Sequence, residues 1–324
     1  MTQFSSPTWL TNPHLQTLLP RLIRRKPLFT PFWQRVDTRD GDFIDLAWSE
    51  YWQSPHVTHK PIFILFHGLE GHFNSPYANG IMQAFKKAGW LCVMMHFRGC
   101  SGEPNRYARS YHSGHTDDAR QVIELLDEHF PHQAKVALGV SLGGNMLANY
   151  LAQYRDNPKL SAASIVSAPF DLAACSQRIE QGFSKVYCRY LLNSLKRNAL
   201  LKANLIEQQL GLKADDISAI KQLSDFDDQL TAPLNGFSNA QDYYQQCSAL
   251  TRLNDITIPT QIIHAQDDPF MTEAVIPRYV LSEYIDYQLL PHGGHVGFLT
   301  GSSLKPRFWL EESLPSYYQS FGQS

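Results

Sequence analysis

The chain alternates between short apolar runs and longer segments in which apolar residues recur at helical spacing. The apolar runs are "PIFILFHG" (61–68), "LCVMMHFRG" (91–99), "AKVALGV" (134–140), "AASIVSAPF" (162–170), "TQIIHAQDD" (260–268) and "IDYQLLPHGGH" (285–295). Continuous runs such as "PIFILFHG" are typical of strands that are buried on both faces of a sheet. We therefore predict six strands of a mostly parallel central sheet.

Helical patterns lie between these runs. They are "MQAFKKAGW" (82–90), "TDDARQVIELLDEHF" (116–130) and "LGGNMLANYLAQY" (142–154). Gly89 is expected to end the first helix, and Thr116 is expected to cap the second, with Asp117 and Asp118 complementing its dipole. The alternation of strands and helices predicts an α/β fold with helices on both faces of the sheet.

Two segments depart from this alternation. Residues 173–246 are helical and polar in pattern and contain no convincing strand. We interpret them as a cap-like helical insertion over the strand ends, within a single domain that spans residues 1–324. The first 55 residues look like a lead-in with one or two strands, and the turn "RDGDF" (39–43) predicts a hairpin there.

A serine between glycines marks the junction between the third apolar run and the helical pattern that follows it. Gly139, Ser141 and Gly143 form a Gly-X-Ser-X-Gly pattern. At a strand-to-helix elbow this pattern presents a serine on a strained turn, and a Cβ at either glycine would collide with a neighbouring element. We interpret Ser141 as a nucleophile in preference to the alternative, a plain tight turn.

A serine hydroxyl needs a base, and in this class of fold the chain order is Ser, acid, His. His295 is the favoured base over His292, because glycines precede it and helix-like residues follow it. His264 lies inside an apolar run and is expected in the core. A metal pair at His292 and His295 is the weaker alternative, because no third ligand stands at zinc spacing.

The orienting acid is expected on the loop after the fifth apolar run, in "HAQDDPF" (264–270). Asp268 is favoured because it stands three residues after the small residue Ala265 and precedes Pro269-Phe270. Its carboxylate would hold the imidazole tautomer and stabilise the imidazolium. Asp267 is expected to cap the turn. The alternative is that both aspartates merely cap a turn before the proline.

Two backbone amides are expected to form an oxyanion hole. One is the amide of Leu142, directly after the nucleophile, and the other is the amide of Leu69 in "HGLEGH" (67–72). His67 is expected to brace that loop. Arg98 is expected to tie loops together near the site, with anion binding as the alternative, and Cys100 has no base arrangement of its own.

Composition limits the partners of the 324-residue chain. With 28 Lys and Arg against 30 Asp and Glu, the formal net charge of −2 offers no basic surplus for nucleic acid or anionic lipid. A basic cluster at "RLIRRKP" (21–27) is interpreted as a solvated or packing segment. Five scattered cysteines without a CxxC pair indicate free thiols. We expect a cytoplasmic protein, because no signal peptide or bilayer-length apolar run is visible.

The motifs together resemble the α/β-hydrolase fold and, more narrowly, the YheT-like group, the fourth family of α/β-hydrolase-domain proteins. The matching stretches are "NPHLQTLLP" (12–20), "FHGLEG" (66–71), "HFRGCSGEPN" (96–105), "GVSLGGN" (139–145), "AQDDPF" (265–270) and "GGHVGF" (293–298). The resemblance implies serine esterase or lipase-type activity on carboxylic esters, with acyl transfer to alcohols in some members. Eukaryotic members carry an N-terminal membrane anchor, and none is expected here.

The leading hypothesis is a serine hydrolase that cleaves small-molecule carboxylic esters through an acyl-enzyme, with no metal or organic cofactor. An acyltransferase with the same triad is the first alternative, and a non-catalytic ligand-binding protein on a hydrolase scaffold is the second. Apolar and aromatic residues of the helical insertion, such as Tyr187 and Tyr190, are expected to line an acyl pocket. We therefore expect a preference for medium-chain over acetyl esters.

Overall fold

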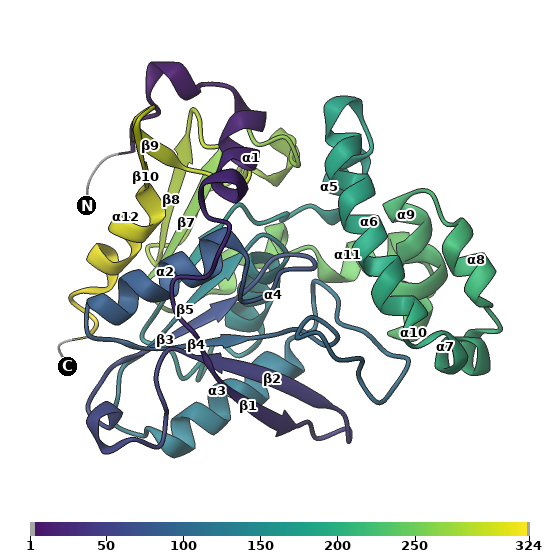
Figure 1. Cartoon of the computed structure of the whole chain (residues 1–324), viewed down its shortest axis with the longest axis horizontal. Coiled ribbons are helices and arrows are strands. Elements are labelled where there is room, and N and C mark those ends of the chain that lie inside the picture. Colours follow the sequence, from purple (N-terminus) through teal and green to yellow (C-terminus); the bar gives the residue numbers. More distant parts are fainter. Residues whose placement is uncertain (1–3, 323–324) are drawn as a thin grey trace.

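The computed structural model describes residues 4–322, which form an eight-stranded sheet flanked by helices (Figure 1). The strands are β1 (Phe32–Asp37), β2 (Phe43–Trp48), β3 (Ile62–Phe66), β4 (Leu91–Met95), β5 (Lys135–Val140), β6 (Ala162–Val166), β7 (Thr260–Ala265) and β8 (Ile285–Leu290). Their order is β1-β2-β4-β3-β5-β6-β7-β8, with antiparallel pairing only at β1–β2 and β2–β4. The predicted mostly parallel α/β sheet is confirmed.

Helices cover both faces of the sheet, because successive strand side chains point to opposite faces and both faces are apolar. Phe63 and Leu65 of β3 pack in the core that includes α2 (Pro76–Lys87) and α12 (Trp309–Tyr318). Ile64 and Phe66 pack in the opposite core, which includes α3 (Asp117–His129) and α4 (Leu142–Gln153). The sheet is therefore the middle layer of three.

The predicted helix ends are partly right. Gly89 follows α2 in the left-handed region, with φ +92°, and so ends this helix as expected. Thr116 occupies the N-cap position of α3, but its hydroxyl donates to the Gln153 side chain at 3.0 Å instead of capping the helix. The expectation that Thr116 caps the helix is therefore wrong. Its hydroxyl makes a tertiary hydrogen bond instead of a local one to the backbone amides of α3.

The chain between β6 and β7 consists of helices and the short loops that join them over residues 172–247, with no strand in this segment, as the pattern indicated. Its helices are α5 (Leu172–Ile179), α6 (Lys185–Leu200), α7 (Ala203–Leu210), α8 (Ala214–Ala219), α9 (Leu223–Phe226), α10 (Ala232–Leu234) and α11 (Ala240–Cys247). A π-helical turn, Asp227–Thr231, joins α9 to α10. Figure 1 shows most of this segment as a green lobe beside the sheet. The lobe has an apolar cluster of its own, which includes Leu192, Ile206 and Leu230.

The lead-in contains the expected β1–β2 hairpin and also a helix that the sequence pattern did not predict. This helix, α1 (Pro13–Ile23), begins where the Asn12 side chain accepts hydrogen bonds from the amides of His14 and Leu15. The buried Gln16 side chain of α1 accepts a hydrogen bond from the Leu299 amide and donates to the Leu299 carbonyl. The start of the chain is thus tied to its last quarter.

The residues after His295 are not helical, which corrects the expectation from their pattern. They form a two-stranded hairpin of β9 (Leu299–Ser302) and β10 (Lys305–Phe308). Val296 and Phe298 both have positive φ angles, which a helix does not allow. Short 3₁₀ segments complete the described secondary structure at Thr8–Leu10, Pro55–Val57, Gly182–Ser184, Leu250–Asp255 and Glu273–Val275.

Candidate active site

Ser141 stands at the junction between β5 and α4 in a strained conformation. Its φ of +52° and ψ of −121° lie in a region that residues with a side chain rarely adopt. A Cβ at Gly139 would lie 2.5 Å from the Gly143 carbonyl oxygen, and a Cβ at Gly143 would lie 2.4 Å from the His67 carbonyl oxygen. Both glycines are therefore required by the close approach of backbone, as the elbow motif predicts.

The structure brings together the three side chains singled out from the sequence. His295 Nε2 lies 3.0 Å from Ser141 Oγ, and His295 Nδ1 lies 2.9 Å from Asp268 Oδ2. Because an ionised carboxylate only accepts hydrogen bonds, the Asp268 contact assigns the ring proton to Nδ1 and leaves Nε2 as an acceptor for the serine hydroxyl. The Asp268 side chain is 1% exposed and that of His295 is 10% exposed, so both contacts are shielded from bulk water.

Neighbouring groups hold the His295 ring and its loop in place. The ring of Phe270 stacks on the imidazole, with centroids 3.9 Å apart and planes 7° apart. The His295 amide donates to Thr17 Oγ1 of α1 at 2.9 Å, and the next amide, of Val296, donates to Ser167 Oγ at 3.3 Å. The imidazole is therefore positioned by two elements far away in the sequence.

Asp267 and His292 lie beside the site but not in it. Asp267 accepts a hydrogen bond from the Gly294 amide at 2.9 Å, and its other oxygen lies 3.2 Å from His292 Nδ1. Burial raises the pKa of Asp267. Asp267 thus holds the glycine loop that precedes His295, and the expectation that it caps its own turn is wrong, because both of its oxygens contact that loop. The turn is capped by Asp268, whose second oxygen accepts from the Phe270 amide at 2.8 Å.

In the loop after β3, the amides on either side of Leu69 are each held by a tyrosine hydroxyl. The Gly68 amide donates to Tyr77 Oη at 2.9 Å, and the Glu70 amide donates to Tyr111 Oη at 2.9 Å. Within residues 4–322, neither the Leu69 amide nor the Leu142 amide donates a hydrogen bond. These two amides are thus left available to an added oxygen.

His67 fixes the orientation of the peptide unit that carries the Leu69 N–H. Its Nε2 accepts from the Phe97 amide at 3.0 Å, so Nδ1 carries the proton and donates to the Gly68 carbonyl at 2.7 Å. Because a peptide unit is planar, holding the Gly68 carbonyl also sets the direction of the Leu69 N–H. Burial lowers the pKa of His67 to about 3, which keeps the ring neutral. This arrangement agrees with the expected bracing role.

Arg98 and Cys100 lie near the loop but are committed to other contacts. The Arg98 guanidinium donates to the carboxylates of Asp118 and Asp40 at 2.7 Å each, and so links two loops as expected. An anion at Arg98 would have to displace these carboxylates. Burial raises the pKa of the Cys100 thiol well above its usual value, which disfavours a thiolate. His264 is buried in β7, where it contacts Tyr287 Oη and the Ala168 carbonyl.

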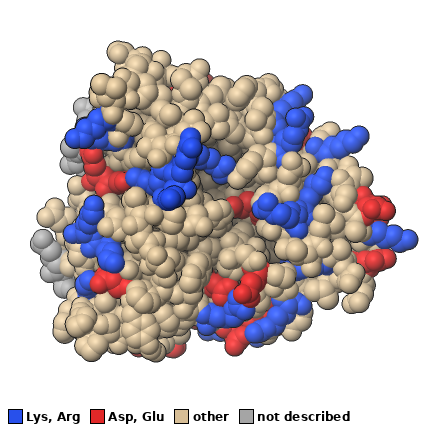
Figure 2. Space-filling view, viewed as in Figure 1, with Lys and Arg blue, Asp and Glu red and all other residues tan. Residues whose placement is uncertain are grey.

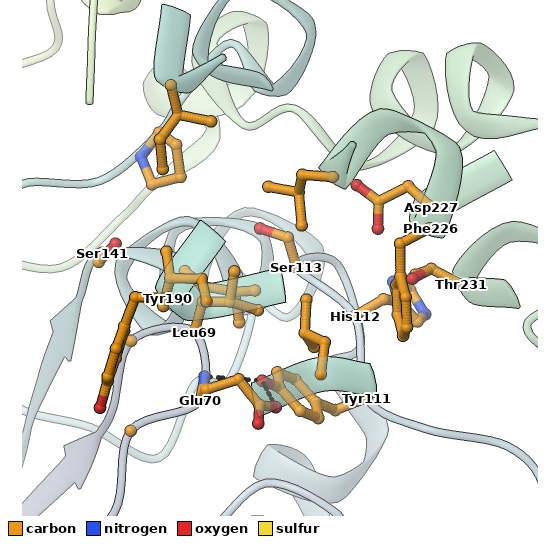
Figure 3. A pocket seen from close by; sticks show the side chains of 18 of the residues that line it. Leu69, Glu70, Tyr111, His112, Ser113, Ser141, Tyr190, Phe226, Asp227 and Thr231 are labelled. Carbon is orange, nitrogen blue, oxygen red and sulfur yellow. Dashed lines mark hydrogen bonds between the residues drawn. The ribbon is translucent and has the colours of Figure 1, made fainter. Parts of the chain in front are cut away.

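A cavity of about 400 Å³ extends from Ser141 into the helical segment. Figure 3 shows Ser141 on one side of it and Phe226, Asp227 and Thr231 on the other. Apolar residues of the helical segment that line the cavity are Leu172, Ile179, Val186, Leu191, Leu195, Leu223, Phe226, Leu230 and Leu234. Glu70 and Asp227 are acidic lining residues, and burial raises the pKa of both, to about 6 for Asp227. The cavity is thus mainly apolar, as small-molecule sites usually are.

Comparison with known proteins agrees with this architecture. The protein family described as the alpha/beta hydrolase fold matches residues 61–302. The chain belongs to the α/β-hydrolase family. Within it, this hydrolase is YheT-like: it is 52% identical to the YheT protein of Escherichia coli (strain K12) over 312 residues, which cover 96% of this chain and 91% of that protein.

More distant relatives of this α/β-hydrolase carry the names of lipases. Phospholipase ABHD3 of Mus musculus is 29% identical over 299 residues, which cover 90% of this chain and 72% of that protein. The monoacylglycerol lipase of Saccharomyces cerevisiae is 29% identical over 269 residues, covering 81% of this chain and 60% of that protein. Among solved structures, an esterase of Pyrococcus furiosus aligns with a TM-score of 0.58 at 13% identity, covering 99% of this chain and 100% of that one. The structural likeness supports the fold alone.

Among the helices within residues 4–322, none is both long enough and apolar enough to span a bilayer.

Proposed function

We propose that the protein is a serine hydrolase that cleaves carboxylic esters through an acyl-enzyme, with Ser141 as nucleophile, His295 as base and Asp268 as orienting acid. The protein is an ester hydrolase of the esterase and lipase type, as its family and the names of its relatives support. The observation that carries the finer proposal is the continuous chain of hydrogen bonds from Ser141 through His295 to Asp268.

In the acylation step, Ser141 Oγ attacks the ester carbonyl carbon while His295 Nε2 takes the hydroxyl proton. The carbonyl oxygen becomes negatively charged and is stabilised by the amides of Leu69 and Leu142. The bond to the alcohol oxygen then breaks, and His295 returns the proton to the leaving alcohol. Asp268 keeps Nδ1 protonated and stabilises the imidazolium in between.

In the deacylation step, water takes the place of the alcohol. His295 Nε2 removes a proton from the water as its oxygen attacks the acyl carbon, and the same two amides hold the second oxyanion. Collapse of this intermediate breaks the bond to Ser141 Oγ, which takes the proton back from His295. The products are the carboxylic acid and the free enzyme.

A fluorophosphonate probe tests the proposal, because such probes react preferentially with activated serines. We expect one label per chain, found by mass spectrometry on the peptide that contains Ser141, and no label on the Ser141→Ala variant. Labelling at another residue, or none on the folded protein, would contradict the assignment.

Product analysis with added ethanol or glycerol separates ester hydrolysis from acyl transfer, because an acyltransferase would form the new ester and not the free acid.

We also propose that the helical segment 173–246 acts as a cap whose inner face binds the acyl chain. A fully buried methylene contributes about 0.8 kcal/mol, so a chain four carbons longer gains up to about 3 kcal/mol. We expect kcat/KM to rise from acetyl to medium-chain esters by as much as about 200-fold. The Leu191→Trp variant, which fills part of the cavity, is expected to move the optimum toward shorter esters.

The matched control for this variant is Arg189→Trp. Arg189 lies on the same helix, is exposed and does not line the cavity. The measurement is kcat/KM against acyl length for the wild type and both variants. A profile that is flat in the wild type, or that shifts equally in both variants, would rule out acyl binding by the cap.

The tyrosine contacts of the oxyanion loop lead to a separate prediction. In Tyr111→Phe the Glu70 amide loses its acceptor, and the Glu70 carboxyl loses a donor that lies at 2.9 Å. We expect kcat to fall on the order of ten-fold with little change in KM, because a displaced Leu69 amide weakens binding of the oxyanion and not of the substrate.

Tyr150→Phe serves as the control for Tyr111→Phe. Tyr150 is also buried, and its hydroxyl donates to the Pro158 carbonyl at 2.9 Å, remote from the site. If the control lowers kcat as much, or if Tyr111→Phe raises KM and leaves kcat unchanged, Tyr111 does not position the oxyanion loop.

A further inference from the structure

Although the formal net charge is −2, two segments of the chain contain Lys and Arg residues but no Asp or Glu. The first acidic residue of the chain is Asp37, whereas five Lys and Arg residues lie between positions 21 and 35. No Asp or Glu occurs between positions 181 and 206, where five Lys and Arg residues lie. The first segment contains α1, and the second contains α6.

These two helices lie side by side at the entrance of the cavity. The Tyr187 hydroxyl of α6 lies 3.0 Å from His14 Nδ1 of α1, and the rings of His14 and Phe183 are 4.4 Å apart. One helical turn or more further along, the guanidinium of Arg21 lies 4.5 Å over the ring of Tyr190. Arg21 and Tyr190 both line the cavity and are both exposed, so they mark its mouth.

Apolar side chains on both helices are exposed beside this mouth. On α1, Leu15 is 49% exposed and Leu22 is 61% exposed. Phe183, just before α6, and Val186 of α6 are each 52% exposed. Phe183, Val186 and Tyr190 recur at intervals of three and four residues, which places them on one stripe of the helix. We call Leu15, Leu22, Phe183, Val186 and Tyr190 the apolar rim.

Basic side chains that form no salt bridge surround the apolar rim, although the charge of one of them, Arg197, acts on the Glu70 carboxyl in the cavity. They are Arg21, Arg25 and Lys26 at the end of α1, and Arg197 on α6. Arg197 lies seven residues after Tyr190 and so on the same stripe. Within residues 4–322 none of the four is in a salt bridge, whereas Arg24 between them pairs with Glu311. Figure 2 shows Lys and Arg side chains on both sides of the hollow in the middle of this face.

Arg21 and Arg197 act electrostatically on one shared neighbour, His72 on the loop that follows β3. Burial, and then the charges of these two arginines, lower the pKa of His72. The positive charges of α1 and α6 thus act on the same face of the protein.

We propose that the apolar rim and its four basic side chains dock onto the surface of an anionic lipid bilayer. Exposed apolar side chains flanked by Lys and Arg are the combination that binds the headgroup region, the apolar groups entering the interface and the cations binding acidic lipid. In this orientation the cavity mouth faces the lipid, so an ester with a long acyl chain could enter without crossing water. The docking surface does not depend on which residues carry out hydrolysis.

Vesicle sedimentation tests this proposal with the full chain. We expect binding to vesicles of phosphatidylcholine and phosphatidylglycerol in a 3:1 ratio, much weaker binding to pure phosphatidylcholine vesicles, and loss of binding as salt is raised. Arg25→Gln/Lys26→Gln is expected to weaken binding about 25-fold, from roughly five-fold per basic side chain. Leu15→Ser/Leu22→Ser is also expected to weaken it. None of these four residues lines the cavity, so hydrolysis of a short soluble ester should not change.

Matched controls remove the same kinds of side chain elsewhere. Arg155→Gln/Arg278→Gln removes two exposed charges, and Val280→Ser/Leu304→Ser removes two side chains that are 90% and 96% exposed. These variants should bind like the wild type. No binding to anionic vesicles, equal binding to neutral ones, or equal losses in the controls would overturn the proposal. A dimer in analytical ultracentrifugation would also overturn it, if Arg25→Gln/Lys26→Gln or Leu15→Ser/Leu22→Ser dissociated that dimer. A second copy of the chain would then occupy this surface. Inactivity on soluble esters alone would instead count against the proposed hydrolase.

Discussion

Ester hydrolysis is expected to fall roughly 10⁴–10⁶-fold when Ser141 is replaced by alanine, the scale known for triad serines. The substitution removes the one oxygen that lies 3.0 Å from His295 Nε2. It should leave the fold intact, because the Ser141 side chain makes no capping bond to α4 and the glycines that permit the elbow remain. The measurement is kcat/KM for a chromogenic ester of the length that the wild type prefers.

Circular dichroism and thermal unfolding provide the control for Ser141→Ala. A small residual rate is expected, since the oxyanion amides and the cavity would still act on water. If the folded variant keeps more than about one hundredth of the wild-type rate, another residue is the nucleophile. The Ser167→Ala variant is a useful comparison, because Ser167 also has a positive φ at the end of a strand but its hydroxyl only helps to hold the loop of His295 through the Val296 amide, so a far smaller loss is expected.

The second large effect is expected from Asp268→Asn, which should lower kcat roughly 10³–10⁴-fold. An asparagine can present its NH₂ group toward His295 Nδ1, which favours the tautomer that cannot accept the serine proton. The volume is unchanged, and the oxygen that caps the turn at Phe270 can be kept. The rate should therefore fall without a matching loss of stability.

Asp267→Asn is the matched control, one residue away. Asp267 contacts the Gly294 amide and His292, so its replacement perturbs the loop but leaves the contact between Asp268 and His295 in place. We expect a loss of about ten-fold or less. A larger loss in Asp267→Asn than in Asp268→Asn would transfer the orienting role to Asp267.

The sheet and the three central side chains could be predicted because each depends on local pattern. Continuous apolar runs mark buried strands, and the carboxyl ends of parallel strands meet at one edge of the sheet. Ser141 and Asp268 follow such runs closely, whereas His295 follows β8, which is only partly buried and contains Asp286 and Gln288. The proximity of these three side chains could therefore be predicted from the order of the strands, without knowledge of how the side chains pack.

The groups that support these side chains could not be predicted in the same way. Thr17 lies in the stretch "NPHLQTLLP" (12–20), but nothing in that stretch indicates that Thr17 accepts a hydrogen bond from the His295 amide. The contact of Tyr111 with the Glu70 amide likewise arises only from tertiary packing. The helix-like pattern after His295 was misleading, because backbone conformations at Val296 and Phe298 with positive φ have no clear signal in side-chain type. Phe270 was noted only as a neighbour of Asp268, and its stacking on His295 is a consequence of the fold.

The large separation of the contacting residues has a consequence during protein synthesis. His295 is added 154 residues after Ser141, which at roughly 5–20 residues per second takes about 8–30 s. During that interval Ser141 lacks the His295 imidazole, and Thr17, which is added 278 residues before His295, lacks the amide from which it accepts a hydrogen bond. If Ser141 is the nucleophile as proposed, the nascent chain should not react with esters until His295 has left the ribosome, and the first probe labelling in a translation reaction would time the completion of the fold.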